Sequence, residues 1–137
     1  MKNQIRNFVL GAGLAALLCG PSLMAQTQET AEIPFDFHVG KSSLPAGTYS
    51  VAKQTFANGL LLRNDDTNNS ILLQAVVREE GKTNPRLTFR CYDGDCFLSA
   101  IWIPGTAGYL MAKTSREKEV EKGGARLAMS YVPLATR

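Results

Sequence analysis

The stretch from Cys91 to Cys96, CYDGDC, constrains the fold more than any other part of the sequence. Its central Asp-Gly pair is a strong signal for a two-residue hairpin turn, because both residues tolerate the positive φ angles that this turn requires. The turn sets the register of the flanking strands, so that Tyr92 faces Asp95 and Cys91 faces Cys96. The opposed cysteines then have Cα atoms about 4.5 to 5.5 Å apart, within reach of a disulfide. The sequence therefore predicts a β-hairpin closed by a Cys91–Cys96 disulfide.

The same register extends along both strands of this hairpin. One face then carries the cysteines and mainly apolar side chains, which is the pattern of a core face, with Trp102 further along it. The other face is mixed, which fits a surface that is half solvated or covered by a helix. The register predicts the pairs Arg90–Phe97, Phe89–Leu98, Thr88–Ser99, Leu87–Ala100 and Arg86–Ile101.

Two other uses of the cysteine pair have less support. A thioredoxin-type redox motif has two residues between its cysteines ahead of a helix, whereas four residues in a turn separate these cysteines. A zinc site needs about four ligands, and the only histidine of the chain is His38. We therefore favour a structural disulfide, and we expect no metal and no cofactor.

Residues 1–25 have the layout of a secretory signal peptide. Lys2 and Arg6 give a basic start, an uncharged apolar run covers residues 8–20, and the small residue Ala25 precedes a polar segment. A membrane-spanning helix needs about 20 apolar residues, more than this run provides. We expect cleavage after Ala25, export to the periplasm or the extracellular space, and no transmembrane span afterwards.

The remaining chain is expected to form one domain. Residues 26–31 are polar and are predicted to be a flexible N-terminus, and residues 32–137 are predicted to be a single β domain. A lipoprotein anchored through Cys19 is disfavoured, because Leu18 stands where a small residue usually precedes the lipidated cysteine. After cleavage 13 basic and 12 acidic side chains remain, so the chain lacks the clustered positive charge of a nucleic-acid-binding protein.

Short segments with strand-like patterns recur at roughly ten-residue spacing. This pattern predicts an all-β fold, either a single antiparallel β-sandwich or a small β-barrel with one short C-terminal helix. The segment 70–78 is apolar on both faces, which favours a central strand. The expected strands cover residues 33–39, 48–53, 59–63, 70–78, 86–92, 95–103, 109–112 and 125–132.

The one predicted helix covers the sequence REKEVEK, residues 116–122. Ser115 can cap it, and Thr114 followed by Glu117 resembles a capping box. Val120 is the only apolar residue of this helix, so we expect a solvated surface element.

His38 is the main candidate for chemistry. Asp36 lies two residues away on the same expected strand face and could orient the imidazole ring. Ser42 and Ser43 are close in sequence, but no nucleophile elbow or triad pattern surrounds them. We therefore interpret His38 as part of a polar outer strand face and predict no catalytic residues.

A cluster of oxygen-bearing side chains covers residues 65–69. Calcium loops need alternating oxygen ligands and usually a distant bidentate glutamate, and this cluster lacks that spacing. A polar turn is the favoured interpretation of Asp65, Asp66, Asn68 and Asn69.

Four aromatic residues with polar groups could line a binding surface, because Tyr and Trp are favoured at interfaces. Membership of the core is the alternative, and it is favoured for Trp102. The candidate surface residues are Tyr49, Tyr92, Trp102 and Tyr109.

Several motifs occur along the chain: PFxF at Pro34–Phe37, LPAGTY at Leu44–Tyr49, FLxxIW at Phe97–Trp102, Gly108, and a helix start at Ser115–Glu119. Together they resemble a family of small secreted proteins that are abundant in acidobacteria. The resemblance implies export and a single β domain; it implies no activity, so it transfers no site residue.

The favoured function is an exported non-enzymatic domain that binds a protein, a glycan or an envelope component through a strand edge or an aromatic face. The alternatives are a small β-barrel ligand carrier and a small secreted hydrolase that uses His38. The sequence does not choose among the possible ligands.

Overall fold

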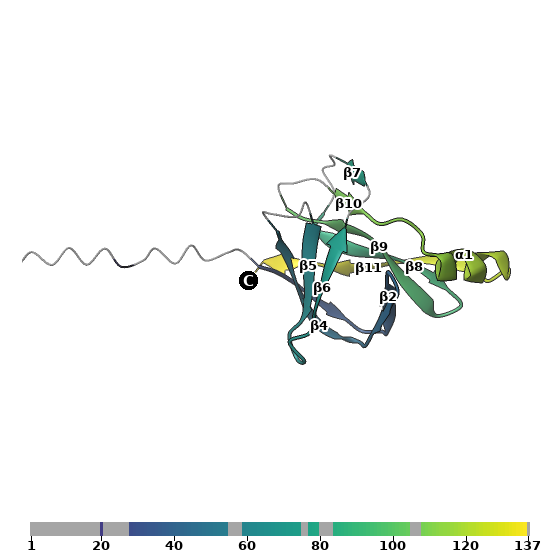
Figure 1. Ribbon diagram of the computed structural model, residues 1–137, viewed down its shortest axis with the longest axis horizontal. Coiled ribbons are helices and arrows are strands. Elements are labelled where there is room, and N and C mark those ends of the chain that lie inside the picture. Colours follow the sequence, from purple (N-terminus) through teal and green to yellow (C-terminus); the bar gives the residue numbers. More distant parts are fainter. Residues whose placement is uncertain are drawn as a thin grey trace, which may run out of the picture.

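The residues that the structure describes form two β-sheets that enclose one core, with a single short helix at one end of the molecule (Figure 1). The computed structural model describes Gly20 and residues 28–54, 59–74, 77–79, 84–104 and 108–136. Apart from Gly20, the expected signal peptide lies outside the described residues. The predicted all-β, sandwich-like architecture with one helix is confirmed.

The first sheet has the strand order β12-β1-β4-β5-β6, and all its pairs are antiparallel. The two edge strands of this sheet are therefore β12 on one side and β6 on the other. The strands are β1 (Glu29–Ile33), β4 (Gly47–Lys53), β5 (Gly59–Asn64), β6 (Ser70–Gln74) and β12 (Ala135–Thr136).

The second sheet has the order β11-β8-β9-β10-β7, with β2 and β3 attached at the start of β9. β2 runs parallel to β9, and the other pairs are antiparallel. The strands are β2 (Phe37–Val39), β3 (Ser42–Leu44), β7 (Val77–Glu79), β8 (Arg86–Tyr92), β9 (Asp95–Trp102), β10 (Gly108–Leu110) and β11 (Leu127–Pro133).

Aromatic rings from both sheets meet in the core. The ring of Phe37 lies 5.2 Å from that of Tyr49 in the first sheet and 5.4 Å from that of Phe89 in the second, both in edge-to-face geometry. Phe35 packs edge-on against Phe89 at 5.0 Å. Such pairs add about 0.5 to 1.5 kcal/mol beyond the burial of their area.

The strand predicted over residues 33–39 is two strands in different sheets, so this prediction is wrong. Pro34 lacks a backbone donor and ends β1, and the chain crosses to the other sheet before β2 begins. The flexible N-terminus predicted over residues 26–31 is also wrong from Glu29 onward. The side chain of Glu29 is buried and accepts a hydrogen bond from Thr136 Oγ1 at 3.0 Å, a distant contact that local composition does not reveal.

The single central strand predicted over residues 70–78 is likewise wrong. The segment divides into β6, at the edge of the first sheet, and β7, at the edge of the second. The apolar side chains on both faces of β6 therefore do not mean that β6 lies in the middle of a sheet.

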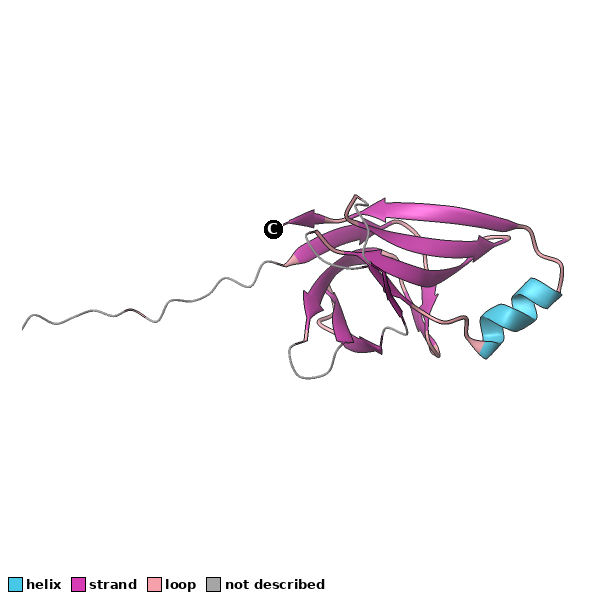
Figure 2. Cartoon of the chain, turned by 90° about the horizontal axis from the view of Figure 1, so that it is seen from above, coloured by secondary structure: helices cyan, strands magenta, loops and turns pink. Residues whose placement is uncertain are grey.

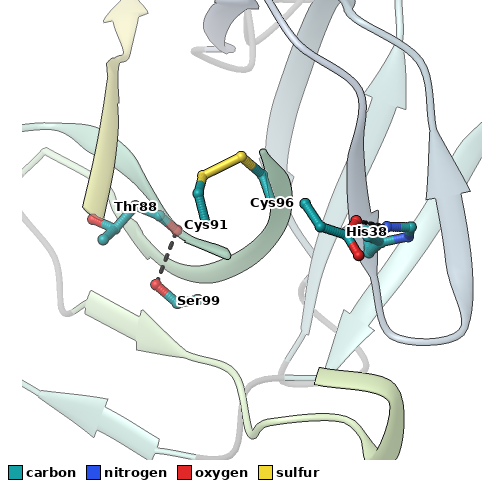
Figure 3. The surroundings of a disulfide bond; sticks show 6 residues. His38, Thr88, Cys91, Cys96 and Ser99 are labelled. Atoms are coloured by element: carbon teal, nitrogen blue, oxygen red, sulfur yellow. Dashed lines mark hydrogen bonds and ion pairs between the residues drawn. A yellow bond between two sulfur atoms is a disulfide. The ribbon is translucent and has the colours of Figure 1, made fainter. Parts of the chain in front are cut away.

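The predicted hairpin and its disulfide are confirmed. Asp93 and Gly94 have φ angles of 49° and 88°, as the two-residue turn requires. Cys91 and Cys96 are paired and disulfide-bonded, with Cα atoms 4.0 Å apart, somewhat closer than expected. Figure 3 shows the disulfide at the end of the hairpin. In the chain-entropy model, so short a loop contributes about 2 kcal/mol or less.

The predicted register holds through Phe89–Leu98 and then shifts by one residue at a β-bulge. Ser99 is the extra residue, and its buried hydroxyl donates a hydrogen bond to the backbone oxygen of Thr88 at 3.0 Å (Figure 3). The shift pairs Leu87 with Ile101, and both are fully buried. The predicted pairs Thr88–Ser99, Leu87–Ala100 and Arg86–Ile101 are therefore wrong, because the turn cannot reveal a bulge further along the strands.

The helix α1 (Ser115–Lys122) lies beyond the ends of the strands (Figure 2). Thr114 caps it by accepting a hydrogen bond from the backbone nitrogen of Glu117 at 3.2 Å. The expectation of a wholly solvated helix is wrong in one respect: the side chain of Glu117 is 1% exposed and pairs with Arg90 Nε at 2.9 Å. A buried ion pair therefore attaches α1 to β8. Among the described residues, no helix is long and apolar enough to cross a membrane.

Candidate functional site

A cleft of about 350 Å³ opens between the edge of β6, the tip of the β2–β3 hairpin and the segment that leads into α1. Its size is in the range of small-ligand sites, about 300 to 1,000 Å³. Apolar side chains from both sheets form much of its wall. The lining residues are His38, Val39, Gly40, Lys41, Ser42, Ile71, Leu72, Leu73, Gln74, Phe97, Leu98, Met111, Ala112, Thr114 and Glu117.

β6 presents its edge to this cleft rather than one of its faces. Four consecutive residues, from Ile71 to Gln74, line the cleft. Side chains alternate between the two faces of a strand, so a consecutive run means that the backbone edge borders the cavity. Leu72, which lines the cleft, is 48% exposed.

The backbone groups at this edge are directed away from β5. The hydrogen bond from Asn64 N to Asn69 O, 2.8 Å, marks that pair as hydrogen-bonded. Alternation along the β5–β6 ladder then turns the N–H and C=O groups of Leu72 and Gln74 outward. Among the strands that the structure describes, none pairs with this side of β6.

A second cavity of about 600 Å³ adjoins the cleft and is lined by three basic side chains, Lys41, Lys113 and Arg116. We call it the basic mouth; its other lining residues are His38, Gly40, Thr114 and Ser115. No carboxylate is among these residues. A hydrogen bond with Glu121 raises the pKa of Lys113 above its ordinary value.

His38 lies between the two cavities and connects the β2–β3 hairpin to β9. Its Nε2 is 2.5 Å from Asp95 Oδ1, and its Nδ1 is 2.8 Å from Ser43 Oγ. The ring lies against Phe97 with centroids 4.8 Å apart. The arrangement brings a serine hydroxyl, an imidazole and a carboxylate into one chain of contacts.

Asp36, which the sequence offered as a possible partner of His38, does not contact it. Asp36 Oδ1 instead accepts a hydrogen bond from the backbone nitrogen of Ala46 at 2.9 Å, because the chain turns at Pro34 and takes Asp36 out of the face of β2. Asp95 takes its place from the start of the neighbouring strand β9, which only the parallel β2–β9 pairing brings close.

The polar cluster 65–69 forms a turn after β5. Asn64 Oδ1 accepts hydrogen bonds from the backbone nitrogens of Asp66 and Thr67, at 2.8 and 3.1 Å. Ser50 Oγ donates to Asp65 Oδ1 at 2.6 Å. These contacts account for the cluster through ordinary turn chemistry.

The four aromatic residues suggested as a binding surface do not form one. Tyr49, Tyr92 and Tyr109 are buried, and Trp102 is half-buried. Tyr49 donates a hydrogen bond to the Pro45 backbone oxygen at 2.6 Å. Their apolar rings contribute more to the core than their hydroxyls could gain from solvent.

Tyr92 provides a test of this burial. Its hydroxyl is buried and has no hydrogen-bond partner among the described residues. Leaving a buried polar group unsatisfied costs about 1 to 3 kcal/mol. Tyr92→Phe is therefore expected to leave the free energy of unfolding at pH 7 unchanged or to raise it. Chemical denaturation measures this, and a loss of more than about 1 kcal/mol would instead mean that the hydroxyl makes a hydrogen bond.

The same substitution should change the pH dependence. Burial, and after it the charge of Glu117, raises the pKa of Tyr92 above its ordinary value. The unfolded chain then loses this proton first, near pH 10, so the native protein loses stability as the pH rises past that value. Tyr92→Phe should weaken this alkaline loss, with Tyr49, whose pKa burial also raises, accounting for part of the remainder.

Sequence reasoning identified His38 but missed Leu72 and the three residues of the basic mouth. Neither left a clear signal in the sequence. Continuous apolar character does not distinguish an edge strand such as β6 from a central strand. Lys41 and Lys113 are far apart in sequence and meet only through the fold.

Comparisons of the chain with protein-family models, with curated proteins and with solved structures gave no match. The resemblance to small secreted acidobacterial proteins therefore stays a prediction.

Proposed function

We propose that the protein is an exported, non-enzymatic binding domain that accepts an extended peptide segment along the edge of β6. The disulfide is compatible with an oxidising compartment, and the periplasm or the extracellular space is the location we propose. The partner is then a protein or a peptide of that compartment.

The edge of β6 that borders the cleft carries this proposal. An apolar molecule alone in the cleft would leave the outward backbone groups of Leu72 and Gln74 without partners, which costs free energy when water is displaced. An extended peptide supplies N–H and C=O groups at the spacing of the strand and places alternate side chains against the apolar wall. A peptide therefore satisfies both the polar edge and the apolar wall, and a lipid-like ligand satisfies only the wall.

The proposal is testable with a pool of random acetylated hexapeptides passed over the immobilised protein. Retained peptides, identified by mass spectrometry and resynthesised, should slow amide hydrogen exchange at Leu72 and Gln74. If no peptide is retained, or if protection appears only far from β6, strand addition at this edge is wrong.

Leu72→Pro provides a matched substitution for this test. Proline removes the outward N–H at an edge position, where a strand tolerates it best. We expect this variant to lose binding of the retained peptides by about tenfold or more, whereas Leu72→Ala, which keeps the N–H, should lose less. Isothermal titration calorimetry measures both affinities, and circular dichroism shows whether each variant is folded. Equal losses in two folded variants would argue against backbone pairing.

A second candidate, a hydrolase, is favoured by the chain Ser43–His38–Asp95. A nucleophile, a base and an orienting carboxylate within hydrogen-bond reach are the arrangement of covalent acyl transfer. It ranks second because Ser43 lines neither cavity, so a substrate held in the cleft would not be held against it. In the alternative, structural role, which we call a clamp, the same contacts only hold the β2–β3 hairpin to β9.

A fluorophosphonate probe separates these two roles. If the contacts form a clamp, the intact mass of the protein stays unchanged after prolonged incubation with the probe. A stoichiometric adduct on Ser43 that disappears in His38→Ala would establish an activated serine and favour the hydrolase.

A further inference from the structure

We infer that the basic mouth anchors the C-terminal carboxylate of the peptide bound along β6. This inference rests on the proposed function, because it names the part of the peptide that the second cavity receives.

The two cavities form one continuous path. They share His38, Gly40, Lys41 and Thr114 in their walls. A ligand that follows the edge of β6 therefore reaches the basic mouth without leaving the protein surface.

The basic mouth receives the part of the bound peptide that extends past β6. No residue of β6 lines it, so it offers no strand edge to a peptide backbone. The group that enters it belongs to the end of the ligand rather than to the part paired with β6. A main-chain carboxylate is the charged group that every peptide with a free C-terminus carries at that position.

The charge of the mouth suits this group. The three basic residues of the mouth, Lys41, Lys113 and Arg116, favour an anionic ligand, and no carboxylate in the lining competes with that ligand. Among the ion pairs of the described residues, neither Lys41 nor Arg116 has a partner, and Lys113 is held by Glu121 at 2.9 Å. This last pair is exposed, and exposed pairs contribute little, so an incoming carboxylate can share or replace it.

The test compares two hexapeptide pools of the same composition, one ending in a free carboxylate and the other in an amide. We expect the resynthesised acid-ended peptides to bind about tenfold more tightly than their amide-ended forms, as two or three partly exposed charge contacts would produce. The difference should shrink as the salt concentration rises.

A charge-matched pair of variants locates the effect. Lys113→Gln and Arg116→Gln together, at two residues that line the mouth but not the cleft, should greatly reduce the preference for the acid-ended peptides and leave the affinity of the amide-ended ones unchanged. The control replaces two exposed basic residues outside both cavity walls, Lys53 and Arg126, by glutamine; it should keep the preference.

The outcomes separate this inference from the proposed function. If both pools bind equally and protect β6, strand addition stands and the carboxylate anchor is wrong. If amide-ended peptides that contain Asp or Glu bind as tightly as acid-ended peptides, the mouth binds an acidic side chain rather than the C-terminal carboxylate, and the inference is also wrong. If neither pool binds, the proposed function itself fails.

Discussion

Glu117→Ala should lower the free energy of unfolding by about 3 kcal/mol, because it leaves the guanidinium group of Arg90 unpaired in a largely buried position. Glu117 accepts from Arg90 Nε with both carboxylate oxygens, at 2.9 and 3.2 Å. It is also the contact by which α1 is held to β8. Urea denaturation followed by circular dichroism measures the loss.

Replacing both partners separates the ion pair from the space that it fills. The double variant Arg90→Met with Glu117→Leu should be close to the wild-type protein in stability, since well-packed apolar residues often substitute for a buried ion pair without loss. If Glu117→Ala alone costs less than about 1 kcal/mol, Arg90 finds water or another partner, and the pair does not hold the helix.

Gly108→Ala should lower the free energy of unfolding by about 2 kcal/mol, through overpacking against Trp102. Gly108 is the cross-strand partner of Trp102, and the indole ring lies over it. A Cβ added at Gly108 would be 2.7 Å from Cη2 of Trp102 and closer still to other ring atoms. The ring would have to leave its place.

A double-mutant cycle tests this cause. In a Trp102→Leu background the same Gly108→Ala change should cost little, because the overlapping ring is gone. Thermal and urea denaturation of the four proteins measure the coupling. If Gly108→Ala costs the same with and without the indole ring, the ring is not what requires glycine at this position.

Features that depend on residues close together in sequence were predicted correctly, and features that depend on distant residues were not. The disulfide hairpin was predictable because an Asp-Gly turn sets the register of its nearest neighbours. The bulge was not, because it depends on a buried hydroxyl, that of Ser99, finding the backbone oxygen of Thr88. Likewise Glu29 looked like part of a polar tail, and its pairing with Val51 and Thr136, both distant in sequence, makes it part of a sheet.

The candidate site was the least predictable part, for the same reason. His38 was visible as the only histidine, but Asp95 and Ser43 reach it from different strands. The apolar segment 70–78 was detected and assigned to the wrong place, because continuous apolar character does not distinguish a central strand from an edge strand that borders a cleft. The misassigned residues of β6 are the ones on which the proposed function rests.

The pairing of β1 with β12 has a consequence for the order of folding. A hydrogen bond joins residues 107 positions apart there, whereas the β8–β9 hairpin closes through a two-residue turn. Hairpins form in about 1 to 10 μs, and contacts between distant residues form later because their loop closure costs more entropy. Until β12 arrives, the first sheet has unpaired edges at both β1 and β6. Intermediates that lack β12 should therefore be the species most prone to pair edge to edge with one another.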